Sequence, residues 1–304
     1  MLLRKKGEHM NYQQFIVAVK EKTTALLGET VTVRIQTVLK NNGTKRVGLM
    51  ITKPTVNISP TIYLEQFFIQ YQNGRRLSEI AKNIQSLYEE VKPEQSWQIE
   101  ALLDFQSAQT KLAFKLIQHN QNVELLENIP HIPYLDLEIV FYVLLDDCEQ
   151  GVATILITND MVNHWGISTE MLYQVAMTNT PRILGAECKP MYEMVSELLG
   201  EEPEETDEQE GILYVLTNSL RYFGAACLLY PQVLEDIGNQ IDDDYYLLPS
   251  SIHELIILPA QYALSAHELK EMITDINASQ LMDEEVLSDH AYYYNRKENR
   301  VVAV

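Results

Sequence analysis

The sequence predicts an α+β fold, with mixed and mainly antiparallel sheets, packed helices and two subdomains. Apolar residues alternate with polar ones in neighbouring runs that short polar turns connect, which is the pattern of β-hairpins. Apolar stripes at helical spacing lie between these hairpins and do not alternate regularly with single strands, as they would in a doubly wound α/β fold. The chain has 304 residues, of which 46% are hydrophobic, enough for two packed subdomains.

The chain is expected to divide into a leader and two subdomains. Residues 1–9 are predicted to be a non-native or disordered leader, because Lys6–Met10 matches what a ribosome-binding site and start codon would encode if translated. Residues 10–128 are predicted to form a helix/β-hairpin/helix subdomain. Residues 129–304 are predicted to form an α+β subdomain with an exposed acidic loop at 200–210, which has too few apolar side chains to bury.

The first elements of the amino-terminal subdomain have clear boundary signals. Asn11 can cap a helix whose apolar stripe ends at Gly28. Apolar and polar residues then alternate over 31–36 and again over 47–51, on either side of Asn41–Thr44. This pattern predicts a β-hairpin with a glycine-containing loop.

Two more helices are expected before the pattern becomes ambiguous. The second is predicted to begin at Ser59–Pro60, since proline suits the first helical position. The third carries an apolar stripe over 77–88. The weaker predictions that follow are a short helix at 97–105, a strand at 111–118 and a helical turn at 122–128.

The carboxyl-terminal subdomain has predicted strands and helices in alternating groups. The strands are predicted at 135–145, 152–158, 212–216, 226–230, 245–248 and 252–258, with a last hairpin of 292–294 and 300–302. The helices are predicted at 159–166, after Ser168, after Pro190, at 231–241, and after a capping box formed by Ser265 and Glu268.

Charge is distributed unevenly along a chain whose formal net charge is −20. Residues 1–120 contain 16 basic and 10 acidic residues, whereas residues 121–304 contain 7 and 33. This asymmetry indicates either two regions that face different partners or each other, or a solvated acidic surface. Net acidity disfavours a general polyanion binder, so a nucleic acid is not expected as a partner.

Basic residues cluster only in two predicted loops. Lys45 and Arg46 are predicted to lie in the hairpin loop, and Arg75 and Arg76 follow Asn73-Gly74. Four charges on two loops predict at most a small anion-binding patch.

The compartment is predicted to be the cytoplasm, without membrane association. The longest apolar runs are far shorter than the roughly 20 residues that a spanning helix needs, and the first residues lack the order of a signal peptide. Cys148, Cys188 and Cys227 are isolated in the sequence, which suits a reducing compartment and predicts no disulfide framework.

The common cofactor and catalytic motifs are absent from the sequence. There is no H-E-x-x-H, no P-loop, no G-x-G-x-x-G and no G-x-S-x-G. We therefore expect no cofactor and no metal site.

The most unusual local stretch is 248–254, Leu-Pro-Ser-Ser-Ile-His-Glu, between two apolar strands. Ser250, Ser251, His253 and Glu254 are the candidate catalytic residues, because hydroxyls, an imidazole and a carboxylate can serve nucleophilic or acid–base chemistry. The structural alternative is an ordinary turn after proline. On a strand, His253 and Glu254 would point to opposite faces and could not orient each other.

One further signal comes from a set of short segments, which are Asn42-Gly43, 59–65, 165–167, 214–218, 222–225, 248–254, 258–259 and 286–289. Together these segments resemble an uncharacterised bacterial family, domain of unknown function 5688, which is common in gut Firmicutes. The resemblance covers most of residues 10–300, and it implies no activity, cofactor or catalytic residue.

Two classes of function remain open on these grounds. The first is a non-enzymatic interaction or regulatory protein that binds another protein, which the tyrosine-rich and charge-polarised chain favours. The alternative is a hydrolase that uses the 248–254 segment. Whether the protein is an enzyme is therefore uncertain, and the lack of a recognisable catalytic set argues against it.

Overall fold

The chain forms two compact units. The computed structural model describes residues 10–53, 61–91, 104–148, 151–200, 213–249, 251–262 and 265–304. Unit 1 comprises residues 1–40 and 44–102, and unit 2 comprises residues 41–43 and 103–304. The predicted leader, the acidic segment 201–210 and Ser250 lie outside the described residues.

The charge asymmetry of the sequence follows this division. Unit 1 contains 14 basic and 9 acidic residues, a net of +5, and unit 2 contains 9 and 34, a net of −25. The two units therefore differ in the sign as well as the size of their charge.

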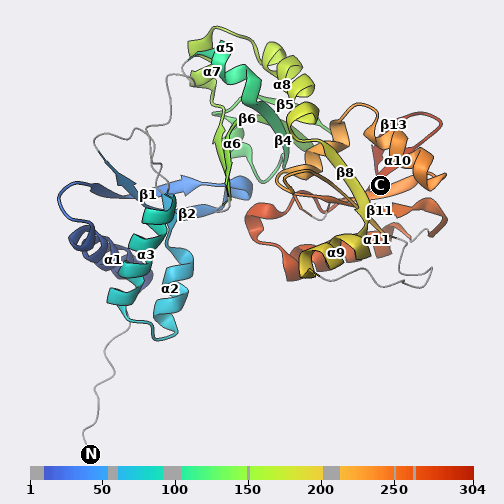
Figure 1. Ribbon diagram of the computed structural model, residues 1–304. Coiled ribbons are helices and arrows are strands. Elements are labelled where there is room, and N and C mark those ends of the chain that lie inside the picture. The colour runs from blue at the N-terminus through green and yellow to red at the C-terminus, as the bar shows by residue number, and fades with distance from the viewer. Residues whose placement is uncertain are drawn as a thin grey trace, which may run out of the picture. The chain divides into compact units, whose positions relative to one another are not determined.

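Unit 1 packs three helices against a small antiparallel sheet. In chain order its elements are α1 (Tyr12–Leu27), β1 (Thr32–Leu39), β2 (Lys45–Thr52), β3 (Thr61–Tyr63), α2 (Glu65–Gln72) and α3 (Leu77–Val91). The strand order is β1-β2-β3, and Figure 1 shows the helices gathered on one side of this sheet. Asn11 caps α1 as predicted, and its side chain accepts the N–H of Gln14 in a capping box.

The core of unit 1 comes from one face of each element. Phe15 and Val19 of α1 are fully buried, as are Leu49 of β2 and Ile80 and Ile84 of α3. These apolar side chains recur at helical spacing on α1 and α3 and at alternate positions on β2, so burial follows the periodicity of the sequence.

The second predicted helix is present as α2, but its predicted start at Ser59–Pro60 is wrong. Residues 61–63 instead form β3, which pairs antiparallel with β2, and α2 begins only at Glu65. Gly48 makes this pairing possible, because a Cβ on Gly48 would lie 2.9 Å from the Ile62 carbonyl oxygen. The Glu65 carboxylate also accepts the Val47 N–H at 2.7 Å, so contacts with β2 determine where the helix starts.

The first sheet of unit 2 is built around the long strand β6. Its strands are β4 (Leu112–Gln118), β5 (His131–Tyr134), β6 (Leu137–Cys148) and β7 (Gly151–Leu156), and the other three all pair antiparallel with β6. The helices of this region are α5 (Phe105–Ala108), α6 (Val123–Leu126), α7 (Asn159–Trp165) and α8 (Thr169–Ile183). The pairing of β4 with β6 places residues 104–128 in unit 2, so this division differs from the predicted boundary at residue 128.

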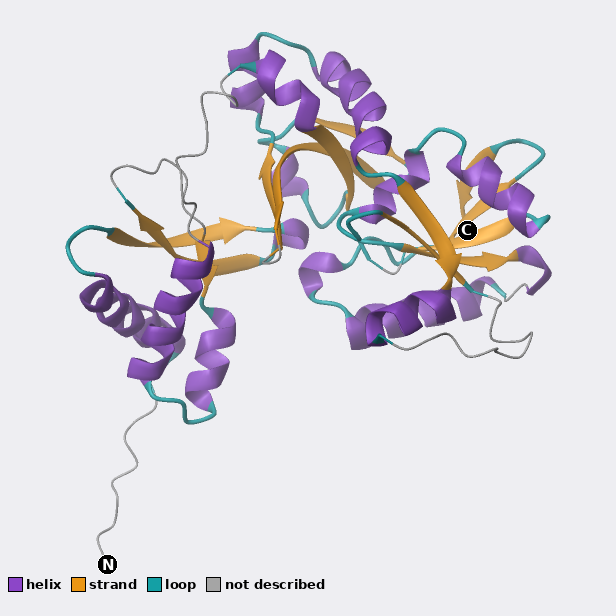
Figure 2. Cartoon of the chain, viewed as in Figure 1, coloured by secondary structure: helices purple, strands orange, loops and turns teal. Residues whose placement is uncertain are grey.

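The second sheet of unit 2 has six strands in the order β13-β12-β10-β11-β9-β8, and every neighbouring pair is antiparallel. The strands are β8 (Ala186–Pro190), β9 (Tyr214–Asn218), β10 (Tyr245–Leu248), β11 (Leu255–Pro259), β12 (Tyr292–Asn295) and β13 (Arg300–Ala303). The helices are α9 (Met191–Leu199), α10 (Val233–Ile241) and α11 (Ala266–Gln280). Leu248 and Ile256 pack against Leu269 and Ile273 of α11 on one face. Figure 2 shows the helices and strands of this region by type.

The strand predicted at 226–230 is also wrong. Residues Gly224–Leu229 form a 3-10 helix, η4, in which Gly224 to Leu228 are buried. A short and continuous apolar run cannot distinguish a buried strand from a buried helical turn by periodicity. The overall class is nevertheless confirmed, because antiparallel sheets and packed helices make this an α+β protein.

No helix in the described parts of the chain combines the length and apolarity that crossing a bilayer requires.

Candidate functional site around His253

The 248–254 segment lies between β10 and β11 in unit 2, beside the turn that follows β9. Two other segments that carried the family resemblance lie close to this one. One contacts His253 directly, and the other adjoins a residue that approaches His253. Tyr222-Phe223-Gly224 meets His253, and Glu285 directly precedes the segment 286–289. Tertiary structure thus brings together residues that are widely separated in the sequence.

Ser251 shapes the turn that holds His253. Its side chain is buried, and its Oγ accepts the backbone N–H of His253 at 3.0 Å. A serine hydroxyl that accepts the amide two residues later is a common way to stabilise a turn. The amide of Ile252 donates to the Glu285 carbonyl at 2.8 Å, which ties the turn to the chain before β12.

The imidazole of His253 makes one defined hydrogen bond. Its Nδ1 accepts the backbone N–H of Phe223 at 3.1 Å, so the neutral ring must carry its hydrogen on Nε2. Nε2 lies 4.0 Å from Oε1 of Glu285, too far for a hydrogen bond. Burial lowers the pKa of His253, the Glu285 carboxylate opposes this shift, and Lys115 adds to it.

Aromatic rings enclose the other sides of the imidazole. The Phe223 ring stacks on His253 with centroids 5.7 Å apart and an interplanar angle of 9°, and the Tyr222 ring lies 5.2 Å away. The Lys115 ammonium lies 4.0 Å from the centroid of the Phe223 ring, within cation–π distance.

Phe223 has an unusual backbone conformation at this site. Its φ is 58°, in the left-handed region that bulky residues rarely adopt. Such strain persists only where surrounding contacts over-determine it, and here the hydrogen bond to His253 and the stacked rings provide those contacts. His253 therefore stabilises the strained turn into η4.

Glu254 occupies a different environment from that of His253. Burial raises the pKa of Glu254, while the nearby Arg221 guanidinium lowers it. Ser251 contacts the backbone of His253 rather than its ring. Among the described residues, no hydroxyl forms a hydrogen bond with the His253 ring. The structure thus places Ser251, His253 and Glu254 in one turn without a side-chain hydrogen-bond relay among them.

The basic residues predicted as an anion patch all belong to unit 1. Lys45 and Arg46 begin β2. The next residue, Val47, donates its N–H to the carboxylate of Glu65 at the start of α2. Arg75 and Arg76 are exposed and follow the other end of α2. A helix of eight residues is about 12 Å long, so α2 separates the two pairs by this length.

A second polar cluster of unit 2, centred on Asp136, was not among the predicted sites. The Ser288 hydroxyl donates to one carboxylate oxygen of Asp136 at 2.7 Å, and the Tyr292 hydroxyl donates to the other at 2.8 Å. His290 lies 3.7 Å from the same carboxylate and 2.9 Å from Asp289. The segment 286–289, which contains Ser288, carried part of the family resemblance and so pointed to this region. Nothing in the sequence indicated that Asp136 would be its partner.

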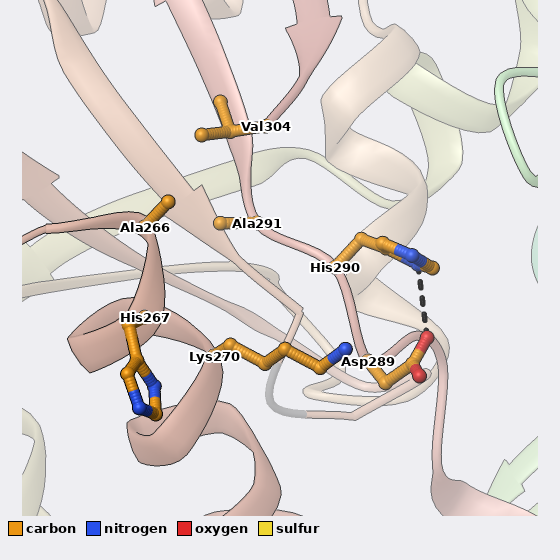
Figure 3. Close-up of a pocket in the computed structure, with 7 residues that line it drawn as sticks. All are labelled: Ala266, His267, Lys270, Asp289, His290, Ala291 and Val304. Carbon is orange, nitrogen blue, oxygen red and sulfur yellow. Dashed lines mark ion pairs between the residues drawn. The ribbon is translucent and has the colours of Figure 1, made fainter.

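A shallow hollow of about 370 Å³ adjoins this cluster (Figure 3). Its lining residues are Ala266, His267, Lys270, Asp289, His290, Ala291 and Val304. Lys270 extends from α11 toward Asp289, which forms an ion pair with His290. The side chains of His267, His290 and Asp289 are half exposed or more, so solvent screens their charges.

Across the described ranges, no group of three or more His, Cys, Asp or Glu side chains is placed to hold a metal ion. The thiols of Cys188 and Cys227 are free, and burial raises their pKa to about 11 and about 12, respectively. Protonated thiols at these positions are poor nucleophiles and poor metal ligands.

The fold and site define an α+β protein in which a half-buried histidine and a strained aromatic turn hold the second sheet to its surrounding loops. The chain belongs to the family of unknown function DUF5688, which matches residues 12–296. No curated protein and no solved structure matches the chain.

The titration of His253 predicts how stability depends on pH. A folded-state pKa below the ordinary 6.5 means that the unfolded chain binds the proton more tightly, so acid favours unfolding. The contribution of His253 is expected to be complete above pH 6.5 and to decline as the pH falls toward the folded-state pKa. Protonating Nδ1 would also place a second donor against the Phe223 N–H.

This prediction is tested by measuring the free energy of unfolding of the wild type and His253→Asn between pH 8 and pH 5. The difference between the two proteins should shrink as the pH falls below 6.5. A difference that stays constant, or grows toward acid, would contradict the assignment.

Proposed function

We propose that this protein is a non-enzymatic interaction or regulatory protein of the cytoplasm, and that its partner is another protein. The opposite net charges of its two units support this proposal, because each surface potential favours a different class of approaching molecule.

The single observation that carries the proposal is that the Nδ1 lone pair of His253 is already occupied by a backbone hydrogen bond. A general base needs a free lone pair that faces the proton to be removed. The lone pair of Nδ1 already accepts the Phe223 N–H, and Nε2 carries the hydrogen of the neutral ring. An imidazole in this state supports a turn and is poorly suited to take a proton from a nucleophile.

The hydrolase alternative requires a different arrangement at the same residues. A nucleophilic serine should lie within hydrogen-bond distance of an imidazole nitrogen, and an acid should orient the opposite nitrogen. Ser251 is buried, and its Oγ accepts a backbone N–H. Nδ1 of His253, which an acid would orient in a hydrolase, accepts a backbone N–H instead. These contacts favour a structural role for Ser251 and His253.

Two substitutions at His253 separate the hypotheses. In His253→Asn, the side-chain oxygen can occupy the position of Nδ1 and accept the Phe223 N–H, whereas His253→Ala removes the acceptor. We expect His253→Ala to lower the free energy of unfolding by about 2 kcal/mol and His253→Asn to lower it by less than half of that. Urea denaturation of the full chain measures both values.

The functional readout uses the same two variants. A partner is first identified by co-purification from native lysate, and its affinity is then measured with both proteins purified. We expect His253→Asn to bind this partner as the wild type does. If the wild type hydrolyses an ester, amide or phosphoester substrate and folded His253→Asn loses that activity, the hydrolase alternative replaces this proposal.

A further inference from the structure

Strand β1 of unit 1 is long and has one paired edge. It pairs with β2 over eight positions, from Thr32↔Thr52 to Leu39↔Lys45, and in the described part of the chain β2 is its sole neighbour. An edge strand presents backbone donors and acceptors that can pair with another chain. Natural proteins usually protect such edges with proline, several charges or a bulge, but β1 contains no proline and one charged residue, Arg34.

The hydrogen bonds of the hairpin show which backbone groups face the open edge. Lys40 N–H donates to the Thr44 carbonyl at 2.8 Å, so this pair is of the hydrogen-bonded type. Because hydrogen-bonded and non-hydrogen-bonded pairs alternate, the pairs of Ile35 and Thr37 are of the second type. Leu64 N–H donates to the Val47 carbonyl at 2.9 Å on the β3 side, which agrees with this assignment for Thr37↔Val47. The N–H and C=O groups of Val33, Ile35 and Thr37 therefore point away from β2.

The side chains in the middle of β1 are accessible to solvent. Residues 34–37 are all exposed, although they lie in the middle of a strand and point to both faces of the sheet. Ile35 is 40% exposed, whereas Leu49, its direct partner on β2, is fully buried. On this face the core of unit 1 covers Leu49 and also Val33, which is 6% exposed, but it leaves Ile35 partly uncovered. An added strand would extend the apolar face beside Ile35.

Charge indicates the chemistry of the missing strand. Unit 1 has a net charge of +5, in a protein whose other unit carries −25. Arg34 is exposed on the face opposite to Ile35, and it forms no ion pair with the described residues. A strand beside β1 would place alternate side chains next to Ile35 and next to Arg34, and the latter should be acidic.

We infer that the edge of β1 binds an extended segment of a partner protein in which apolar and acidic residues alternate. Backbone hydrogen bonds to Val33, Ile35 and Thr37 give affinity, and the alternation of side chains gives specificity. This inference rests on the proposed interaction function and names the surface and the partner chemistry for it.

The test uses a capped eight-residue peptide of alternating valine and glutamate, with a valine–lysine peptide as its charge-reversed control. The full-length protein is titrated with each peptide, and binding is followed by fluorescence anisotropy and by hydrogen exchange of the β1 amides. We expect the acidic peptide to slow exchange at Val33, Ile35 and Thr37 at least fivefold and to bind more weakly as salt is raised. The lysine peptide should have no effect.

Two substitutions at Ile35 form a matched pair. Ile35→Pro removes the outward N–H without removing an N–H that pairs with β2, whereas Ile35→Thr shortens the side chain and keeps the amide. We expect Ile35→Pro to weaken peptide binding at least tenfold and Ile35→Thr to weaken it less than threefold. The free energy of unfolding of each variant confirms that unit 1 remains folded, and Thr37→Pro replaces Ile35→Pro if it does not.

Three results would overturn the inference. They are equal binding of both peptides, unchanged binding by folded Ile35→Pro, and protection of β1 amides by self-association of the protein without peptide. If the protein partner found with His253→Asn also binds folded Ile35→Pro normally, the β1 surface is wrong but the interaction function stands. The proposed interaction function itself would be contradicted by a different result, namely hydrolysis of a substrate that depends on His253.

Discussion

Replacing Gly224 with alanine is expected to destabilise unit 2 by about 3 kcal/mol or more, the largest effect we predict for a single methyl group. A Cβ on Gly224 would clash with the Thr217 hydroxyl and would lie 2.5 Å from the His253 carbonyl oxygen and 2.7 Å from the Asn218 nitrogen. Two of these three atoms are backbone, and the Thr217 hydroxyl already donates to the His253 carbonyl at 2.8 Å. The clash therefore cannot be relieved by rotating one flexible side chain.

Urea denaturation monitored by fluorescence measures this effect, and Gly185→Ala is its matched control. A methyl group on Gly185 would have no neighbouring atom within 4 Å, so its substitution should change the free energy of unfolding by less than about 1 kcal/mol. Equal effects of the two substitutions would show that β9 and the 251–254 turn do not approach each other closely.

Replacing Asn218 with alanine is expected to cost about 3 kcal/mol, because this buried side chain satisfies three backbone groups. Its Oδ1 accepts the N–H of Leu220 at 3.1 Å and that of Tyr222 at 3.3 Å, and its Nδ2 donates to the Tyr222 carbonyl at 2.9 Å. Alanine would leave these groups unpaired in a turn that leads directly to the strained Phe223. We also expect the Phe223 amide to exchange faster with solvent.

Asn163 provides the control for this substitution. It is exposed on α7, and Asn163→Ala should change stability by less than about 0.5 kcal/mol, since alanine is the better helix former. Hydrogen exchange and urea denaturation of both variants make the comparison. A loss for Asn218→Ala as small as that for Asn163→Ala would mean that water replaces the side chain in the turn.

Local sequence signals predicted many of the elements that have distinctive ends. Asn11 and Ser168 cap α1 and α8 as expected, and Ser265 forms the expected capping box at the start of α11. The alternating runs that flank Asn41–Thr44 pair as the expected hairpin, although its strands extend closer to the loop. These signals succeed because a cap or an alternating strand depends on residues a few positions apart.

The misassigned elements depend on distant partners instead. Residues 61–63 form a strand because Gly48 of β2 leaves room for their backbone, and the edge strand β8 exists only through its pairing with β9. The run at 226–230 has strand-like composition but forms a buried 3-10 turn beside β9. None of these three outcomes is encoded in the periodicity of the segment itself.

The candidate site shows the same division. Sequence singled out Ser251, His253 and Glu254 as unusual, and the resemblance pointed to 222–225 and 286–289. The sequence could not indicate that the Phe223 N–H would donate to the imidazole of His253. Nor could it indicate that the Glu285 carboxylate would lie 4.0 Å from Nε2 of that ring. These relations join residues 30 or more positions apart, and only the packing of β9, β11 and the chain before β12 creates them.

The sequence by itself determined the α+β class, the family, the capped helices and the polarity of charge along the chain. Each of these follows from composition or from interactions within a few residues, which the order of amino acids specifies directly. The tertiary structure alone decided which edge of β1 is open and which atoms the nitrogens of His253 face. Hydrogen-bond direction and burial depend on neighbours brought together by folding, so they cannot be obtained from local sequence.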